Sequence, residues 1–430
     1  MRRVRLPLPD PDKPPPGPFR PEFWRSPLRS PQLTAMLGLV LLIGLPVVAL
    51  TGLLSNDAYQ PGLGGNALGR NVHGPLDLYL FGWPSGPSWL YAFTQGAHVI
   101  IGLAIFPVVL GKLWSVIPRL FEWPPVRSPA HALERLSLAL LVGSALFEFV
   151  TGILNIQYWY AFPFDFTQAH YYGAWVFIGA LLAHIPLKLP TMRHSLAVRK
   201  AVLDGAGPLA SPAVDAHARP LTSPNPGPTT LTRRGLLTAV GGASLILMLQ
   251  GVGQSVGGPL RSLAFLLPRG RTRPGPLGFP VNKTWIGTGL HRGAVGAKWR
   301  LTVRGDRTVV FTREQLLALP QHTYDLPIAC VEGWSTTQSW TGVRVQDLAA
   351  LSGASGRMML TTISLETGTY GSATLGHEQV SDPETLLALR VNGLDLPLDH
   401  GYPARIISPA IPGVHCTKWV SEMQFQTVEA

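Results

Sequence analysis

The sequence predicts a multi-domain protein with an all-α transmembrane four-helix bundle, a fifth membrane helix and a C-terminal α+β domain. Three observations predict this fold class. The 430 residues are 46% hydrophobic and only 14% charged, which is too apolar for a purely soluble protein. Apolar runs of about twenty residues recur before residue 256. After residue 275, strand-like stretches such as 298–303 and 307–312 alternate with short amphipathic segments such as 344–351.

Five apolar runs are long enough to cross a bilayer as helices. They lie at about residues 35 to 54, 89 to 111, 136 to 156, 169 to 187 and 235 to 256. The sequence therefore divides into an N-terminal segment (1–34), a four-helix membrane domain (35–190), a linker (191–232), a fifth membrane helix (233–256) and a C-terminal domain (275–430).

Basic residues alternate in number between the flanks of these runs. Lys and Arg number seven before the first run, then one, four, none and seven in the four connections that follow. The positive-inside rule places the basic flanks in the cytoplasm, so a chain with five spans has its C-terminal domain outside. We therefore expect a multi-pass protein of the cell (inner or plasma) membrane with an extracytoplasmic C-terminal domain.

The net charge of +11 follows mostly from this topology, because the basic residues are scattered around the spans. A nucleic-acid-binding domain would concentrate them in a patch, so we expect no nucleic-acid partner. Four arginines beyond the last run lie on the side that the rule disfavours, where they can meet membrane lipid head groups. They are Arg261, Arg269, Arg271 and Arg273.

Cys330 is one of only two cysteines, and it stands in the sequence PIACVEGWS at residues 327–335. A thiolate is a soft ligand that suits a transition metal, so we interpret Cys330 as a metal ligand. The alternative is an inert, buried core thiol. Glu332, two residues later, shares a face with Cys330 if the loop is extended, and its carboxyl could then relay protons.

Three further blocks follow Cys330: NGLDLP at 392–397, HGYPAR at 400–405 and GVHCTKW at 413–419. In order and spacing they resemble the sulfite-oxidase-fold molybdopterin oxidoreductases, in which one thiolate holds a molybdenum chelated by a pterin dithiolene. The CVEGWS form resembles the bacterial periplasmic methionine sulfoxide reductases more than the sulfite oxidases. The resemblance covers about residues 275 to 430.

This resemblance implies Mo-molybdopterin as a cofactor, with Cys330 as the molybdenum ligand and Glu332 beside it in catalysis. Arg405 and Lys418 stand where the family supplies cations to the pterin phosphate, a pairing that suits that anion. Cys416 stands where the family more often has serine, so we interpret it as a packing residue or a neighbour of the cofactor. The cofactor-binding residues expected are Asn282, Arg405, His415 and Lys418.

Three histidines lie inside the apolar runs, where ionisable residues are rare and often functional. His98 lies in the second run, and His170 and His184 lie in the fourth, 184 − 170 = 14 residues apart, or about 21 Å on a helix. His98 and His170 fall at similar depth when counted from the basic residues that follow each run. Two such imidazoles on adjacent helices can take both axial positions of one b-type haem.

This spacing resembles the four-helix cytochrome b subunit of formate-dehydrogenase-type complexes, in which one histidine on the second helix and two on the fourth bind haem iron. The resemblance implies one haem b and leaves a second open, because residues 35–54 contain no histidine where that family has another ligand. His184 then lacks an obvious partner. His131 is the nearest cytoplasmic candidate, and a structural role between helices is the alternative.

The sequence TRRGLL at residues 232–237 precedes the fifth apolar run. It resembles a twin-arginine export signal, a route for folded proteins that suits a domain loaded with a metal cofactor before export. The alternative is that the two arginines only anchor the cytoplasmic end of a helix.

Together these features predict a membrane-anchored molybdopterin oxidoreductase. Its outer domain would perform two-electron oxo-transfer chemistry on a small molecule, with sulfoxide reduction favoured over sulfite oxidation. Electrons would be exchanged with the quinone or quinol pool through b-type haem in the protein's own membrane domain. The alternative function is a quinol-linked electron carrier whose outer domain binds a cofactor or partner but is not catalytic.

Overall fold

A computed structural model describes residues 13–64, 66, 81–204, 221–273, 275–368 and 370–428. The first twelve residues of the predicted N-terminal segment and residues 205–220 of the predicted linker lie outside this set. The chain divides into two compact units. Unit 1 comprises Met1–Ala49, Ile101–Ile153 and His170–Met248, and unit 2 comprises Leu50–Ile100, Leu154–Ala169 and Leu249–Ala430.

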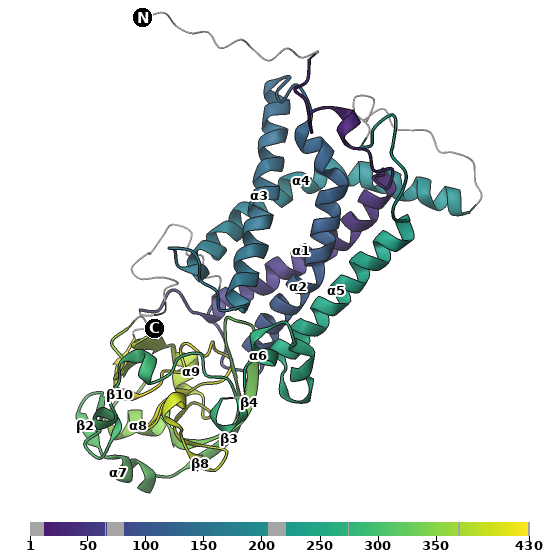
Figure 1. Ribbon diagram of the computed structural model, residues 1–430. Coiled ribbons are helices and arrows are strands. Elements are labelled where there is room, and N and C mark those ends of the chain that lie inside the picture. Colours follow the sequence, from purple (N-terminus) through teal and green to yellow (C-terminus); the bar gives the residue numbers. More distant parts are fainter. Residues whose placement is uncertain are drawn as a thin grey trace, which may run out of the picture. The chain divides into compact units, whose positions relative to one another are not determined.

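Five long helices account for the predicted apolar runs (Figure 1). Among the described residues these five are long and apolar enough to cross a membrane, so the prediction of several candidate membrane helices is confirmed. They are α1 (Pro31–Ala58), α2 (Leu90–Val116), α3 (Pro129–Ile156), α4 (Phe166–Leu203) and α5 (Arg233–Ser255).

Helix α4 continues beyond the point where its apolar run ends. The expected run stopped at 187 and the four-helix domain at 190, but the helix extends to Leu203. Hydropathy falls there because Arg193, Arg199 and Lys200 follow. These residues end an apolar run without ending a helix, since Lys and Arg are good helix formers. The predicted linker therefore begins as helix.

The core of unit 1 is built from one face of α1. Leu33, Leu37, Leu41 and Leu45 are all buried, and their spacing of four places them in one row along the helix. This row packs with buried apolar side chains of α2 and α4 in one cluster, namely Ile105, Val108 and Phe177.

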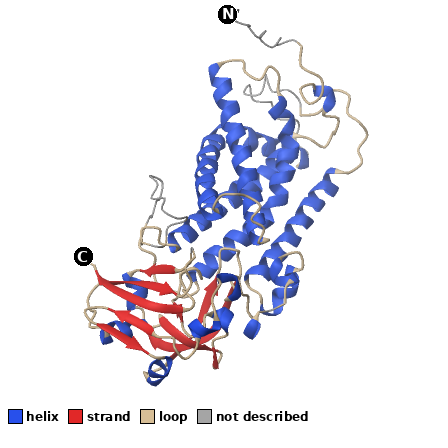
Figure 2. Cartoon of the chain, turned by 60° about the vertical axis from the view of Figure 1, so that its left-hand side comes forward, coloured by secondary structure: helices blue, strands red, loops and turns tan. Residues whose placement is uncertain are grey.

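The C-terminal part of the chain carries all the strands that the structure describes (red in Figure 2). One five-stranded sheet has the order β2-β1-β10-β5-β6, in which β1 and β10 run parallel and the other neighbours antiparallel. Its strands are β1 (Leu301–Arg304), β2 (Thr308–Phe311), β5 (Met358–Ser364), β6 (Ser372–Leu375) and β10 (Val420–Thr427).

The second sheet has the order β3-β4-β7-β8, and β9 also pairs with β7. Its strands are β3 (His322–Ala329), β4 (Ser335–Arg344), β7 (Leu386–Val391), β8 (Leu394–Asp395) and β9 (Arg405–Ile407). The short helices of this part are α6 (Pro268–Arg271), α7 (Arg313–Ala318), α8 (Val345–Leu351) and α9 (His377–Ser381).

These elements confirm a helical N-terminal region followed by a C-terminal domain of mixed helices and strands. The two strands predicted first are β1 and β2, and the amphipathic segment 344–351 is α8. Strand β7 is a nearly continuous apolar run because it is buried on both faces, as expected for a central strand.

Unit 2 is not the same set of residues as the domain drawn from the sequence at 275–430. It also contains residues 50–100 and 154–169, which the sequence assigned to the membrane domain. Side-chain hydrogen bonds tie the first of these segments to the C-terminal part of the chain. Asn66 Nδ2 donates to the carbonyl of Thr374 in β6 at 2.6 Å, and Trp83 Nε1 donates to the Ala410 carbonyl, between β9 and β10, at 2.6 Å.

Gly342 provides a test of the pairing between β4 and β7. A Cβ added there would overlap the Leu387 carbonyl oxygen and lie 2.7 Å from the Ala388 Cα, and these backbone atoms cannot rotate away. Gly342→Ala is therefore expected to lower the free energy of unfolding by about 3 kcal/mol, measured as an earlier thermal transition in tryptophan fluorescence. Gly293→Ala is the control, because nothing lies within 4 Å of its Cβ position. Equal effects of the two changes would contradict the prediction.

Candidate functional site

Cys330 lies in a tight turn that joins β3 to β4. Its backbone N–H donates to the Trp334 carbonyl at 2.9 Å, and the Gly333 N–H donates back to the Cys330 carbonyl at 3.0 Å. Gly333 has φ +84°, a conformation that favours glycine. The GWS part of the motif therefore closes the turn, and Cys330 is held, buried, at the end of a two-stranded hairpin.

Two polar side chains predicted from the sequence lie at the Cys330 thiol. Asn282 Nδ2 donates a hydrogen bond to Cys330 Sγ at 3.3 Å. Glu332 is only 8% exposed, and its Oε2 has no hydrogen-bond partner. The loop is a turn at Glu332 and not the extended segment considered from the sequence, yet the carboxyl still interacts with the thiol.

The electrostatics of this pair favour a cation nearby. Burial, followed by the neighbouring Glu332, raises the pKa of the Cys330 thiol, and burial raises the pKa of Glu332. A metal ion beside the sulfur would reverse both shifts, because a nearby positive charge favours the ionised forms. The buried carboxylate oxygen without a partner and the N–H donor to sulfur therefore fit a metal-bound thiolate.

Arg405 is 1% exposed, and its guanidinium is engaged by the protein itself. Its two terminal nitrogens donate to the His400 and Cys416 carbonyls at 3.1 and 3.0 Å, and the group lies 5.2 Å from the centre of the Trp340 ring. Burial lowers the pKa of Arg405 to about 10. The two terminal nitrogens thus connect the segments around His400 and Cys416, and the N–H of Nε, which has no hydrogen-bond partner, is a donor available to an anion.

Lys418 connects its own segment to those around Lys283 and Asp399. Its Nζ donates to the carbonyls of Lys283 and Asp399, each at 2.8 Å. Burial, with the charge of Arg405 as a second cause, lowers the pKa of Lys418 to about 7. Lys283, which follows Asn282, pairs with the buried carboxylate of Glu366. The cations predicted for a phosphate therefore lie in the same network as the thiol.

His415 lies within the matched block but turns to another part of unit 2. It is buried, and its Nε2 is 2.9 Å from the Tyr59 carbonyl, just beyond α1. Burial lowers the pKa of His415 to about 4, so the ring is neutral at pH 7 and donates to Tyr59. Cys416 is buried with its carbonyl on Arg405, which agrees with a packing role.

His400 is a site residue that the sequence argument missed. It is buried, its Nε2 lies 2.9 Å from the Pro276 carbonyl, and its ring stacks on Phe279 with centroids 3.7 Å apart. The signal was available, since His400 opens the matched HGYPAR block.

Four tyrosines outside the helices were also missed. Burial is the first cause that raises the pKa of each, and the negative charges of Cys330 and Glu332 add to it. The Tyr160 hydroxyl donates a hydrogen bond to Asn155 Oδ1 at 3.0 Å. The tyrosines are Tyr59, Tyr158, Tyr160 and Tyr370.

His170 on α4 is held by α3 within unit 1. Its Nδ1 lies 3.1 Å from Thr151 Oγ1 and 3.1 Å from Glu148 Oε2. Histidines that bind metals through one ring nitrogen usually donate the other to such an oxygen, so this environment fits a ligand. His184 is half-buried on the same helix, and His131 accepts the Arg127 backbone N–H at its Nδ1 at 3.2 Å.

His98 lies on α2 in unit 2, where its ring packs against α1. A Cβ on Gly52 would lie 2.9 Å from the His98 Cε1 atom, so glycine is required for this contact. In the described parts of the chain, no three His, Cys, Asp or Glu side chains gather as a metal cluster. A molybdenum with one protein thiolate and a haem with two histidines do not require one.

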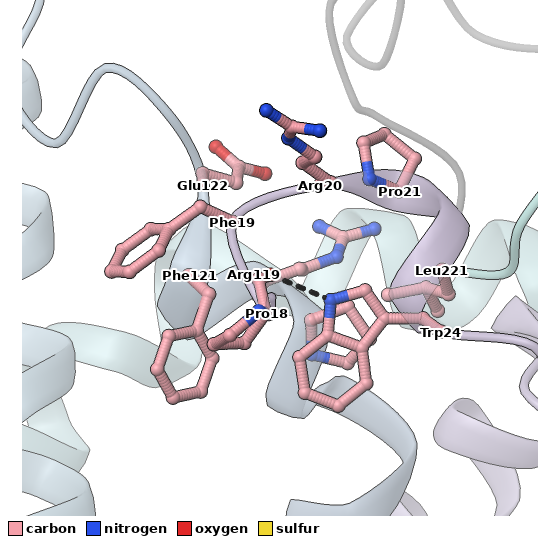
Figure 3. A pocket seen from close by; sticks show the side chains of 10 residues that line it. Pro18, Phe19, Arg20, Pro21, Trp24, Arg119, Phe121, Glu122 and Leu221 are labelled. Carbon is pink, nitrogen blue, oxygen red and sulfur yellow. Dashed lines mark hydrogen bonds between the residues drawn. The ribbon is translucent and has the colours of Figure 1, made fainter. Parts of the chain in front are cut away.

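A hollow in unit 1 is lined by aromatic, proline and charged side chains, among them Arg20, Arg119 and Glu122, and contains none of the predicted site residues (Figure 3). Trp24 Nε1 donates to the Pro18 carbonyl at 2.9 Å across it. The paired arginines Arg233 and Arg234 are exposed at the start of α5, behind Thr232, whose hydroxyl accepts the Gly235 N–H at 3.0 Å as a helix cap.

Comparison with known proteins places the C-terminal part in a family. Residues 291–430 match the family described as "Oxidoreductase molybdopterin binding domain". The "Uncharacterized oxidoreductase YuiH" of Bacillus subtilis (strain 168) is 31% identical over 144 residues, which are 32% of this chain and 72% of that protein. The mitochondrial sulfite oxidase of Rattus norvegicus is 28% identical over 153 residues, 29% of this chain and 28% of that enzyme.

A "Putative protein-methionine-sulfoxide reductase subunit YedZ1" of Azospira oryzae is 29% identical over 154 residues, covering 35% of this chain and 56% of that protein. The chain thus spans less than a third of the sulfite oxidase and little more than half of the subunit. A solved structure, the sulfane dehydrogenase SoxCD of Paracoccus pantotrophus, matches 31% of this chain and 40% of that one at 25% identity, but with a TM-score of 0.28, too low to support an argument on the fold.

The buried histidines predict how acid affects unit 2. Burial lowers the pKa of His415 to about 4 and that of His400 to about 3. Between these values and the unfolded value near 6.5 the unfolded chain binds more protons, so stability falls as the pH falls, by up to about 1.4 kcal/mol per pH unit for each histidine. Amide hydrogen exchange of residues 398–419, corrected for intrinsic rates, should therefore quicken from pH 6.5 to pH 4.5.

His415→Gln should flatten this dependence, because an amide can still donate to the Tyr59 carbonyl but does not titrate. The exposed His291 supplies the control, His291→Gln. An unchanged pH dependence in His415→Gln would contradict the assignment.

Proposed function

The chain belongs to the family of oxidoreductases with a molybdopterin-binding domain, and from this membership we propose that it is a membrane-anchored enzyme whose C-terminal domain performs oxo-transfer on a small molecule. The observation that carries the proposal is the buried Cys330 thiol at the end of the β3–β4 hairpin, with the Asn282 amide on its sulfur and the Glu332 carboxyl beside it. The outer domain under this proposal is residues 275–430, completed by the other segments of unit 2.

Within this site, Cys330 would hold molybdenum and Lys418 would hold the pterin phosphate. When bound, the cofactor supplies two-electron redox chemistry. Two of the three N–H groups of Lys418 donate to carbonyls, so one remains for an anion. Arg405 would add a second positive charge, with its Nε as the donor. Asn282 steadies the thiolate by donating to its sulfur, and Glu332 holds a proton for the substrate oxygen.

We propose reduction of a sulfoxide as the reaction, in preference to oxidation of sulfite. The support is the CVEGWS form of the cysteine loop, together with the printed name of the Azospira oryzae relative. The sulfite oxidases match over less than a third of their own length.

Electrons would reach the site from the quinol pool through one haem b bound by His98 and His170. Two features support the haem site: the spacing and depth of the histidines in the sequence, and the contacts of Glu148 and Thr151 oxygens with His170 Nδ1. His184 would bind a second haem only if a partner is supplied. The topology that goes with it is a multi-pass inner-membrane protein with an extracytoplasmic catalytic domain, exported by the twin-arginine route.

Cys330→Ala is expected to lose molybdenum and to lower sulfoxide-dependent oxidation of a reduced dye by at least about a hundredfold, because the cofactor loses its protein ligand. Molybdenum per polypeptide, measured by elemental mass spectrometry on protein purified in mild detergent, is the direct readout. Cys416→Ser is the matched control, since the second cysteine is also buried and the change leaves in place the backbone carbonyl that accepts from Arg405. This variant should keep both metal and activity. Full activity in metal-free Cys330→Ala protein would sink the proposal.

His98→Ala and His170→Ala should each remove the b-type haem spectrum, because an iron with one axial imidazole is bound weakly. The measurement is haem per polypeptide and the reduced-minus-oxidised difference spectrum, with the exposed His291, changed to alanine, as the control that retains haem. Haem retained in full by His170→Ala would exclude the predicted ligand pair. Haem in wild-type protein that is folded and exported but lacks molybdenum would favour the electron-carrier function.

A further inference from the structure

The carbonyl next to the predicted molybdenum ligand is held by two side-chain amides. Val331 O accepts a hydrogen bond from Gln95 Nε2 at 2.9 Å and another from Asn155 Nδ2 at 3.1 Å. Gln95 lies near the start of α2 and Asn155 in the last turn of α3, and all three residues belong to unit 2. The amides are 7% and 3% exposed. We call this pair of hydrogen bonds the amide clamp.

The orientation of the Asn155 amide is set by a third residue. The Tyr160 hydroxyl donates to Asn155 Oδ1 at 3.0 Å, so the NH2 end of the amide is the end that faces Val331. Both lone pairs of the Val331 carbonyl are thereby used. A network satisfied at every member is rigid and specific.

Two more contacts bring helix ends to the same turn. Ser335 Oγ donates to the carbonyl of Ser255, the last residue of α5, at 2.8 Å. Val99, one turn after Gln95 on α2, packs so closely on Gly333 that a Cβ there would lie 2.7 Å from the valine methyl. The turn from Cys330 to Ser335 is thus fixed by the ends of α2, α3 and α5.

This geometry controls the side chains on either side of the carbonyl. A peptide unit is planar, so fixing the Val331 oxygen fixes the plane that leads to Glu332. Only the Val331 backbone torsions then separate that plane from the Cys330 peptide. A small rotation of the plane would therefore move the Glu332 carboxyl with respect to the thiol.

We propose that Gln95 and Asn155 are positioning residues of the molybdenum site, through which helices of the membrane anchor set the geometry of the Cys330 turn. The inference rests on the proposed function, since it takes Cys330 as the metal ligand. It goes beyond that function because it makes residues outside the molybdopterin-binding domain part of the site.

The experiment uses the full-length protein in detergent and the variants Gln95→Glu and Asn155→Asp, singly and together. Each keeps the shape of the side chain and replaces the donor by an oxygen, and the new carboxylate in Asn155→Asp can still accept from Tyr160. Molybdenum content should stay near that of the wild type, while the Mo(V) electron paramagnetic resonance signal shifts and kcat falls about tenfold to a hundredfold with little change in KM. Gln157→Glu is the matched control, because its amide donates to the Leu266 carbonyl at 3.1 Å, away from the turn.

Tyr160→Phe covers the case in which the double variant does not fold. It removes only the hydroxyl that orients Asn155, and it should shift the Mo(V) signal in the same direction by a smaller amount. An unchanged signal and kcat in Tyr160→Phe and in both single variants would overturn the proposal. The proposal would also be overturned if the variants lost metal only when their thermal transition fell as well, because that result assigns the amides a purely structural role. Wild-type protein without molybdenum would instead refute the proposed function itself.

Discussion

The turn that buries Cys330 is the constraint on which the rest of unit 2 depends. The Cys330 thiol, the Glu332 carboxyl and the Arg405 guanidinium are buried, and Lys418 is half-buried in the same network. Buried polar groups are stable only when they are hydrogen-bonded or paired. Backbone carbonyls meet most of this requirement. The carbonyls of His400 and Cys416 accept hydrogen bonds from the Arg405 guanidinium, and those of Lys283 and Asp399 accept from Lys418 Nζ. Such pairing satisfies the donors while keeping their positive charge available to an anion.

The same requirement explains why one end of each of the five long helices shares a compact unit with the sheets. The Val331 carbonyl, the Trp83 indole and the His415 ring each find their partner in a segment distant in sequence. The turn at Cys330 gains from this arrangement, because the groups that orient it lie on helices. In the proposed function, electron supply and substrate chemistry would therefore share structural elements and not only a linker.

Much of the fold and part of the candidate site could be predicted from the sequence because they depend on local sequence patterns. The five apolar helices, strands β1 and β2, helix α8 and the neighbourhood of Cys330 with Asn282 and Glu332 follow from hydropathy, alternation and short motifs. The extension of α4 to Leu203 could not be predicted, since hydropathy indicates where an apolar run ends and not where a helix ends. The turn at Glu332 was not predicted either. The hydrogen bonds from the Arg405 guanidinium to two backbone carbonyls could not be predicted either, because a sequence motif identifies a residue but not its hydrogen-bond partners.

The sequence by itself determined the class of the protein: which segments are apolar enough to cross a membrane, which domain follows them and which cysteine is the metal ligand to test. Residue type and spacing are enough for that, because they fix hydropathy, periodicity and donor chemistry. Only the tertiary structure decided which amides hold the Val331 carbonyl, and that His415 faces Tyr59. These contacts join residues 176 to 356 positions apart, and no local pattern encodes a pairing that arises from the packing of the whole unit.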